Sequence, residues 1–149
     1  KVFAGNNSIL KITSGLVESY LPPPEASSMW IEDLDLAYIR AKESNKPIFL
    51  DFTGYTCTNC RWMEINVFEE EEVIKLFDKF ILVKLYTDGR EDRHKRYRKL
   101  EIDRFGTAAL PFYVIIDDKD VVISTFPGYS TDSRLFISFL KQAINDFNK

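Results

Sequence analysis

The sequence predicts an α/β fold in which a central mixed β-sheet is covered by helices on both faces. Apolar, strand-like runs alternate with amphipathic helical segments along most of the chain, which is typical of parallel strands joined by crossover helices. Late in the chain, two strand-like runs are separated only by a short Asp-rich turn, which indicates an antiparallel hairpin. Parallel pairs early and an antiparallel pair late together give a mixed sheet.

The composition fits one folded domain with an N-terminal extension. The 149 residues are 45% hydrophobic and 14% aromatic, which is ample material for a core. We expect residues 1–29 to form the extension and residues 30–149 the domain. Residues 8–16 have weak strand alternation, and residues 20–28 have the proline-rich composition of a semi-rigid linker. The extension is interpreted either as a loose tail or as a tether to an upstream domain or membrane segment.

Charge and hydropathy do not favour a nucleic-acid or membrane-embedded role. The formal net charge is −3, and no apolar run approaches the roughly 20 residues that cross a bilayer. Basic residues gather between Arg90 and Lys99, but acidic residues are interleaved with them. We therefore expect no nucleic-acid partner and a soluble chain. A docking surface for an acidic partner protein is a further interpretation of this basic cluster.

The first half of the chain predicts a helix, a strand and a second helical region. An aspartate N-cap and apolar residues at helical spacing predict a helix over residues 33–44, marked by Leu34, Ala37, Tyr38 and Ala41. Residues 48–53 have the composition of a buried strand, interrupted only by Asp51. The helix that follows should turn Trp62 and Ile65 inward, and the polar run of glutamates predicts a break near residues 67–70.

The second half predicts three more strands and two helices. Residues 80–86 form an apolar strand, and residues 90–104 indicate a surface helix with a narrow apolar seam. Residues 112–116 and 121–126 are the two arms of the hairpin, and Pro127-Gly128 should end the second arm. The last helix starts near residue 131 and has a strong apolar stripe, formed by Phe136, Phe139, Leu140, Ala143, Ile144 and Phe147.

Cys57 and Cys60 are the only cysteines, and they stand in one Cys-x-x-Cys motif at the predicted start of a helix. Residues at this spacing share a helix face, so the two sulfurs can form and break a bond. A thiolate in the first helical turn is also stabilised by the helix dipole. A disulfide across two residues closes almost no loop, so redox chemistry explains the pair better than stapling of the fold.

A bound metal or an inert thiol pair is the alternative interpretation of the two cysteines. The chain has a single histidine, so a four-ligand zinc site would lack protein ligands unless carboxylates or water contributed. We expect no metal site, and no cofactor other than the redox-active disulfide itself.

The order of elements and several residues resemble thioredoxin over about residues 33–147. The matching positions are the redox motif Cys57-Thr58-Asn59-Cys60, the buried-strand Asp51, its neighbour Lys84, the cis-proline loop Leu110-Pro111, and Gly128 near the substrate groove. The finer resemblance is to the C-terminal domain of the DsbD thiol:disulfide interchange family, which is similar in the Asp-Phe-Thr-Gly-Tyr run before the cysteines. The chain departs from thioredoxin where Thr53 and Thr56 replace two tryptophans.

The resemblance implies a role for each matched residue. Cys57 is the nucleophile, and Cys60 resolves the mixed disulfide. Asp51, desolvated in an apolar strand, would accept a proton from Cys60 beside Lys84; the alternative is a buried Asp51–Lys84 ion pair without chemistry. A cis Pro111 would present Leu110 to an extended substrate chain, and a trans, structural proline is the alternative. We place the remaining substrate contacts at Tyr55, Thr58, Asn59 and Gly128.

The sequence therefore predicts an enzyme, a thiol:disulfide oxidoreductase that acts as a reductant of protein disulfides. The resemblance further implies a monomeric domain on the periplasmic side, tethered to a membrane electron donor upstream in the same polypeptide. Two alternatives stay open. One is a soluble thioredoxin-like reductase or isomerase, and the other is a non-catalytic binding module that uses the same fold.

Overall fold

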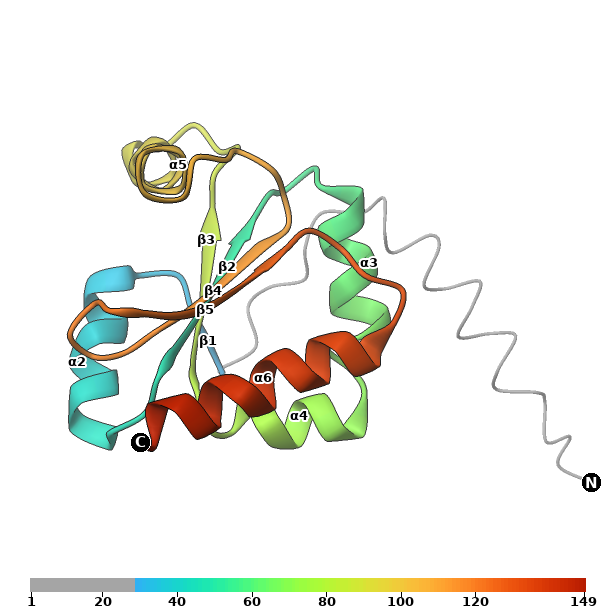
Figure 1. The fold of residues 1–149 in the computed structure, drawn as a ribbon. Helices are drawn as coiled ribbons and strands as arrows, with labels where there is room; N and C mark the ends of the chain where they lie inside the picture. Colours follow the sequence, from blue (N-terminus) through green and yellow to red (C-terminus); the bar gives the residue numbers. More distant parts are fainter. Residues whose placement is uncertain (1–28) are drawn as a thin grey trace, which may run out of the picture.

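The computed structural model describes residues 29–149, which form a five-stranded sheet and five helices (Figure 1). The strands are β1 (Trp30–Ile31), β2 (Ile48–Thr53), β3 (Ile81–Tyr86), β4 (Phe112–Ile116) and β5 (Val122–Pro127). The helices are α2 (Leu34–Ser44), α3 (Thr58–Asn66), α4 (Glu71–Phe77), α5 (Asp92–Phe105) and α6 (Ser133–Phe147).

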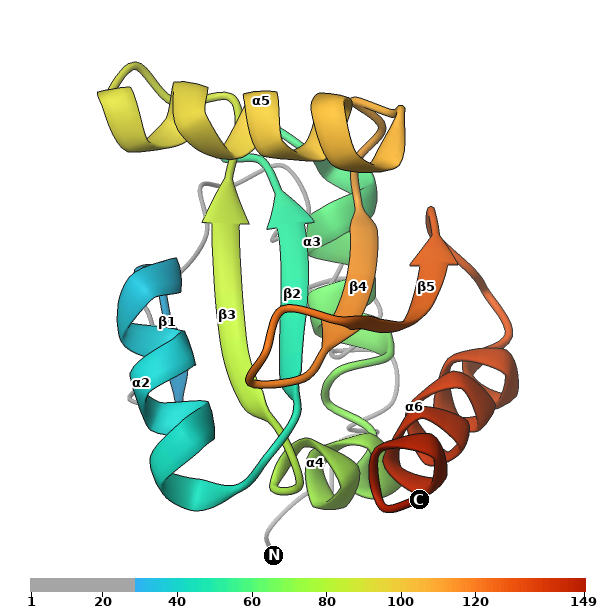
Figure 2. The ribbon, with the colours of Figure 1, turned by 60° about the vertical axis from the view of Figure 1, so that its left-hand side comes forward.

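The sheet is mixed, with the strand order β1-β3-β2-β4-β5. Strands β1, β3 and β2 pair in parallel, whereas β4 is antiparallel to both β2 and β5. Helices α2 and α5 pack on one face, and α3, α4 and α6 pack on the other, as Figures 1 and 2 show together. The predicted α/β class, the mixed sheet and the late hairpin are confirmed. β2 lies at the centre of the sheet.

The predicted elements agree with the observed ones to within about two residues at each end. Asp33 caps α2 as expected, since its carboxylate accepts the Leu36 N–H at 3.1 Å. The predicted break in the polar glutamate region separates α3 from α4. The two-residue β1 was not predicted, and the weak strand and linker expected before residue 29 lie outside the described residues.

Two local expectations need correction. β5 continues through Pro127 instead of ending before it, which is possible because β5 is an edge strand whose outer side needs no amide donor. In α3, Trp62 and Ile65 are half-buried, and Trp62 packs against the aromatic core as predicted. The fully buried residues of this helix are Cys60, Arg61 and Met63, so its inner face includes a charged side chain that was not expected.

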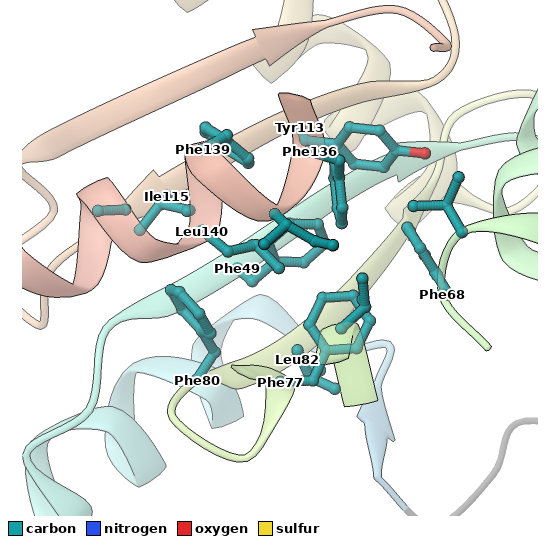
Figure 3. Close-up of a cluster of buried hydrophobic side chains, with 14 of the residues drawn as sticks. Phe49, Phe68, Phe77, Phe80, Leu82, Tyr113, Ile115, Phe136, Phe139 and Leu140 are labelled. Atoms are coloured by element: carbon teal, nitrogen blue, oxygen red, sulfur yellow. The ribbon is translucent and has the colours of Figure 1, made fainter. Parts of the chain in front are cut away.

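The two faces of the sheet have different cores. Towards α2 and α5 the core is largely aliphatic, with Leu50, Val83, Val114 and Ile116 among its members. Towards α4 and α6 it is aromatic, and Figure 3 shows Phe49, Phe68, Phe77, Phe80, Tyr113 and Phe136 packed together. Since successive residues of a strand alternate between faces, Asp51 lies on the same face as Phe49, one step closer to α3. Within residues 29–149, no helix is both long and apolar enough to cross a bilayer.

Candidate active site

The two cysteines lie where β2 gives way to α3, and a disulfide joins them. Cys57 is the N-cap of α3, and its Sγ accepts the backbone N–H of Cys60 at 3.2 Å. After reduction, the same N–H and the helix dipole would stabilise a thiolate on Cys57. Cys57 is half-buried, whereas Cys60 is only 1% exposed. An incoming disulfide can therefore approach Cys57 but not Cys60.

The carboxylate of Asp88, just beyond β3, holds the loop that leads to Cys57. It accepts the backbone N–H of Tyr55 at 2.8 Å, and the backbone N–H and hydroxyl of Thr56, both at 3.1 Å. Partial burial favours the neutral acid, but these three hydrogen bonds outweigh it and lower the pKa of Asp88 below its ordinary value. Asp88 therefore stays ionised and fixes the loop at two consecutive residues.

Gly54 lets this loop approach the segment before β4. A Cβ atom at Gly54 would lie 2.8 Å from Asp88 Oδ2 and 3.1 Å from Leu110 Cδ1, which leaves no room for a side chain. The Leu110–Pro111 peptide bond is cis. The Pro111 carbonyl accepts the N–H of Gly128, a residue with a φ of 78° that favours glycine. The structure thus brings Leu110, Pro111 and Gly128 together beside the loop that carries Cys57.

Charged side chains are buried below α3, next to the dithiol. Asp51 is 1% exposed and Lys84 is 8% exposed, and the two are paired in the register of β2 and β3. Lys84 Nζ lies 3.3 Å from Glu64 Oε1 of α3 and 5.0 Å from the centre of the Trp30 ring. No ion pair joins Lys84 to Asp51 among the described residues, so the alternative interpretation of Asp51, a direct ion pair with Lys84, is not supported. The lysine pairs with the helix and not with the neighbouring strand.

The pKa of Asp51 is raised to about 8. Burial is the largest cause, because it disfavours the charged carboxylate, and the nearby Glu64 carboxylate adds to it. Lys84 and Arg61 act in the opposite direction without reversing the shift. Asp51 is consequently neutral for most of the time at pH 7, yet close enough to ionisation to take up and release a proton.

Arg61 and Glu64 belong to this site and were missed from the sequence. Arg61 is 2% exposed, and its guanidinium donates to Thr53 Oγ1 at 3.1 Å and to the Gly54 carbonyl at 2.9 Å. It also lies 3.3 Å from Glu64 Oε1. Arg61 therefore connects α3 to the end of β2, directly before the loop of the dithiol. The one available clue was that Glu64 lies one helical turn after Cys60, on the same face.

The other predicted contact residues lie around the dithiol in different environments. Thr58 and Asn59 are exposed in the first turn of α3, beside Cys57. Tyr55 is half-buried, with its ring stacked on Tyr86 at a centroid distance of 4.0 Å. All three belong to the loop or to the first helical turn that carries Cys57.

The basic cluster of α5 is largely neutralised by the chain itself. Four of the six Lys and Arg side chains between Arg90 and Lys99 pair with carboxylates: Arg93 with Glu32 and Glu91, Lys95 with Asp92, Arg96 with Asp35, and Lys99 with Asp103. Arg90 and Arg98 form no ion pair among the described residues. Such surface pairs are individually weak, but together they leave little uncompensated positive charge for an acidic partner. In the part of the chain that the structure describes, no group of three or more His, Cys, Asp or Glu residues is arranged to hold a metal ion.

Comparison with known sequences agrees with this geometry. The sequence model of a family described as thioredoxin-like matches residues 29–118. An uncharacterised protein of Caenorhabditis elegans is 35% identical over 81 residues, which are 54% of this chain and 11% of that protein. The thiol:disulfide interchange protein DsbD of Campylobacter jejuni is 31% identical over 71 residues, or 47% of this chain and 12% of that protein. The matched regions thus span about a tenth of these relatives.

Solved structures share the fold at lower sequence identity. The oxidoreductase DsbH is 21% identical with a TM-score of 0.65, and the match covers 83% of this chain and 90% of DsbH. The oxidised C-terminal domain of Neisseria meningitidis DsbD is 17% identical with a TM-score of 0.58, covering 76% of this chain and 98% of that domain. At such identities the likeness concerns the fold. It places the dithiol of this chain on a scaffold shared with these proteins.

Proposed function

We infer that this chain, a member of the thioredoxin-like family with a Cys57–Cys60 disulfide, is a thiol:disulfide oxidoreductase. We propose that it works as a reductant of disulfides in partner proteins. The observation that supports this role most directly is the asymmetry of the pair. Cys57 is accessible at the N-terminus of α3, whereas Cys60 is buried beneath it. One sulfur can attack a partner, and the other can only attack the first.

The proposed reaction has two exchange steps. The Cys57 thiolate attacks one sulfur of the partner disulfide, forms a mixed disulfide and releases the other partner sulfur as a thiolate. Cys60 then loses its proton and attacks Cys57 Sγ, which forms the Cys57–Cys60 disulfide and releases the second partner thiolate. The partner gains two electrons and two protons, and the chain ends in the oxidised state that the structure describes. We propose that this cycle uses no cofactor besides the dithiol.

Asp51 is proposed as the base for the second step. Its pKa of about 8 means that a minor ionised fraction is present at neutral pH and can accept the proton of Cys60. Lys84 is proposed to tune that pKa, since its positive charge favours the Asp51 carboxylate. Leu110 and Pro111, beside the loop of Cys57, are proposed to receive the extended chain around the partner disulfide, together with Gly128, Thr58 and Asn59.

For the whole protein we propose a DsbD-like arrangement. The resemblance over residues 33–147 and the match to Campylobacter DsbD support a domain on the periplasmic side, tethered to a membrane electron donor in the same polypeptide. In this arrangement the donor would reduce the Cys57–Cys60 disulfide after each turnover. A reduction potential near the roughly −270 mV of thioredoxin would support the reductant role, and a value near −120 mV would contradict it.

The test is reduction of insulin by the dithiol form of the protein. We expect the wild type to reduce insulin disulfides, Cys57→Ser to have no activity, and Cys60→Ser to accumulate a mixed disulfide through Cys57 that gel electrophoresis detects without reductant. Because Cys60→Ser keeps the nucleophile but lacks the resolving thiol, it is the matched control for Cys57→Ser. A wild type that leaves insulin oxidised, or a Cys57→Ser variant that still forms the mixed disulfide, would contradict the assigned roles.

A further inference from the structure

The single histidine of the chain, His94, lies in the first turn of α5 and is only 4% exposed. Its Nδ1 atom lies 3.3 Å from the backbone nitrogen of Glu91, the N-cap residue of the helix. Its Nε2 atom lies 3.4 Å from the hydroxyl of Tyr55, in the loop before Cys57. The imidazole therefore connects the start of α5 to the loop that carries the nucleophile.

The chemistry of these two contacts fixes the tautomer of His94. A backbone N–H can only donate, so Nδ1 must accept from Glu91 and carries no proton. A neutral imidazole then holds its one proton on Nε2, and Nε2–H donates to the oxygen of Tyr55. The hydroxyl proton of Tyr55 is consequently not used by His94. Within residues 29–149, Tyr55 Oη donates to no other group, so it is a free hydrogen-bond donor beside the dithiol loop.

Tyr55 is held from two further sides. Its ring stacks on Tyr86 with an interplanar angle of 9°, and its backbone N–H donates to Asp88. The His94 ring meets the Tyr55 ring edge-on at 80°. Burial, followed by the charge of Glu32, raises the pKa of Tyr55, so the hydroxyl keeps its proton at neutral pH. The side chain thus has one defined orientation, of which His94 fixes the polar end.

We propose that His94 is a positioning residue, which aims the Tyr55 hydroxyl so that its free proton binds an acceptor of the partner protein, such as a backbone carbonyl beside the disulfide under attack. This inference rests on the proposed reduction of protein disulfides. It assigns specificity to the pair, because a small disulfide has no peptide chain for Tyr55 to bind. His94 itself touches neither the substrate nor the reacting sulfurs.

The main test compares a protein disulfide with a small one. His94→Gln keeps a side-chain acceptor for the helix N-terminus, as in an ordinary capping box, but has no ring that reaches Tyr55. We expect His94→Gln to raise the KM for insulin about three- to tenfold, the effect of one lost hydrogen bond, with kcat unchanged. Its rate with 5,5′-dithiobis(2-nitrobenzoic acid) should equal that of the wild type. An equal loss with both substrates would overturn the proposal.

A double-mutant cycle on insulin separates positioning from general support of the helix. If His94 acts through Tyr55, the variant with both Tyr55→Phe and His94→Gln should be no worse than Tyr55→Phe alone. Gly89→Ala should have the same effect as His94→Gln, because the new Cβ would collide with the His94 ring. Tyr97→Phe is the matched control: it removes a 3.1 Å hydrogen bond of α5 to the Glu32 carbonyl and should leave the KM unchanged. Additive losses in the cycle would overturn the proposal.

A second measurement needs no turnover. Nitrogen-15 chemical shifts of the neutral imidazole should show a protonated Nε2 and an unprotonated Nδ1, and the other tautomer would overturn the inference. A wild type that shows the expected tautomer but reduces neither disulfide would instead count against the proposed oxidoreductase role. In that case the Tyr55 donor would have no substrate, and the positioning role would fall with it.

Discussion

The layer between the sheet and helices α3, α4 and α6 is built in two contrasting halves. Around Phe49, below α4 and α6, it consists of aromatic rings packed together (Figure 3). Six rings surround Phe49 at centroid distances from 5.3 to 6.2 Å. Below α3, the same layer holds Asp51, Arg61, Glu64 and Lys84. Only one residue of β2, Leu50, separates Phe49 from Asp51. The change from rings to charges therefore occurs within one strand.

The aromatic half stabilises the fold, whereas the buried charges of the other half lower its stability. Each buried ring gains free energy by leaving water, and contacts between rings add to that gain. A buried charge loses its hydration, and pairs such as Lys84–Glu64 recover that loss only in part. The sequence places these charges beside the dithiol, although aromatic residues fill the adjoining part of the same layer. This placement is consistent with a chemical task for the charged half.

The largest effect on stability is expected at Phe49. Replacing this 0% exposed ring with alanine should lower the free energy of unfolding by about 3–5 kcal/mol, because it removes the buried ring and leaves a cavity. Urea denaturation would measure the loss, with Ile39→Ala, at a side chain that is 55% exposed, as the control of small effect. Folded Phe49→Ala should still reduce insulin at the wild-type rate. A loss of activity in the folded variant would mean that the two halves are not independent.

Most of the architecture was readable from the sequence, because strand and helix periods, the Asp-rich turn and the cysteine spacing are local patterns. The position of Asp51 inside an apolar strand was likewise sufficient to predict its burial. Arg61 was not predictable in this way, since hydrophobicity alone favours Trp62 as the inward residue of α3. The burial of Arg61 goes with its hydrogen bonds to Thr53 and Gly54, which exist only in the folded chain.

The partner of Lys84 was missed for a related reason. Neighbouring strands place Lys84 beside Asp51, and the sequence could suggest this pairing from the strands alone. Glu64 comes from a helix, and its distance from Lys84 depends on how α3 crosses the sheet. The same holds for His94, whose contact with Tyr55 joins segments 39 residues apart. Contacts between elements of different type were therefore the part of the site that the sequence did not reveal.

Asp51→Asn should stabilise the fold while it slows the reaction. The folded-state pKa is raised from 3.8 to about 8, so wild-type stability should decline as pH rises from about 4 to 8. The variant lacks this decline and should be more stable at pH 7 by up to about 4 kcal/mol in urea denaturation. Without the base, the step in which Cys60 resolves the mixed disulfide should slow by about 10²-fold.

Two controls belong to this variant. Asp103→Asn removes an exposed carboxylate and should change stability by less than about 0.5 kcal/mol, with no effect on insulin reduction. The wild-type rate of the resolving step, measured by stopped flow, should rise with pH and level off above about 8, whereas the rate of Asp51→Asn should lack this inflection. If Asp51→Asn kept the inflection, another group would have to accept the proton.

A smaller effect on stability is expected at Glu101, a buried carboxyl group on the other face of the sheet. It is 0% exposed, and neither carboxylate oxygen has a hydrogen-bond partner among the described residues. Burial raises its pKa to about 7, opposed only in part by Arg98. Wild-type stability should therefore fall as pH rises from about 4.5 to 7, and Glu101→Gln should be more stable at pH 8 by about 1–2 kcal/mol.

If buried charge serves chemistry only below α3, Glu101→Gln should leave insulin reduction unchanged, because α5 packs against the face opposite the dithiol helix. Thermal unfolding at pH 5 and pH 8 would measure the stability gain, which should nearly vanish at pH 5. Glu43→Gln, at an exposed residue of α2, is the matched control and should show no such pH dependence. A slower reaction in Glu101→Gln would show that charges on both faces of the sheet contribute to the reaction. The contrast between the aromatic half and the charged half of the layer below α3, α4 and α6 would then no longer explain where the function lies.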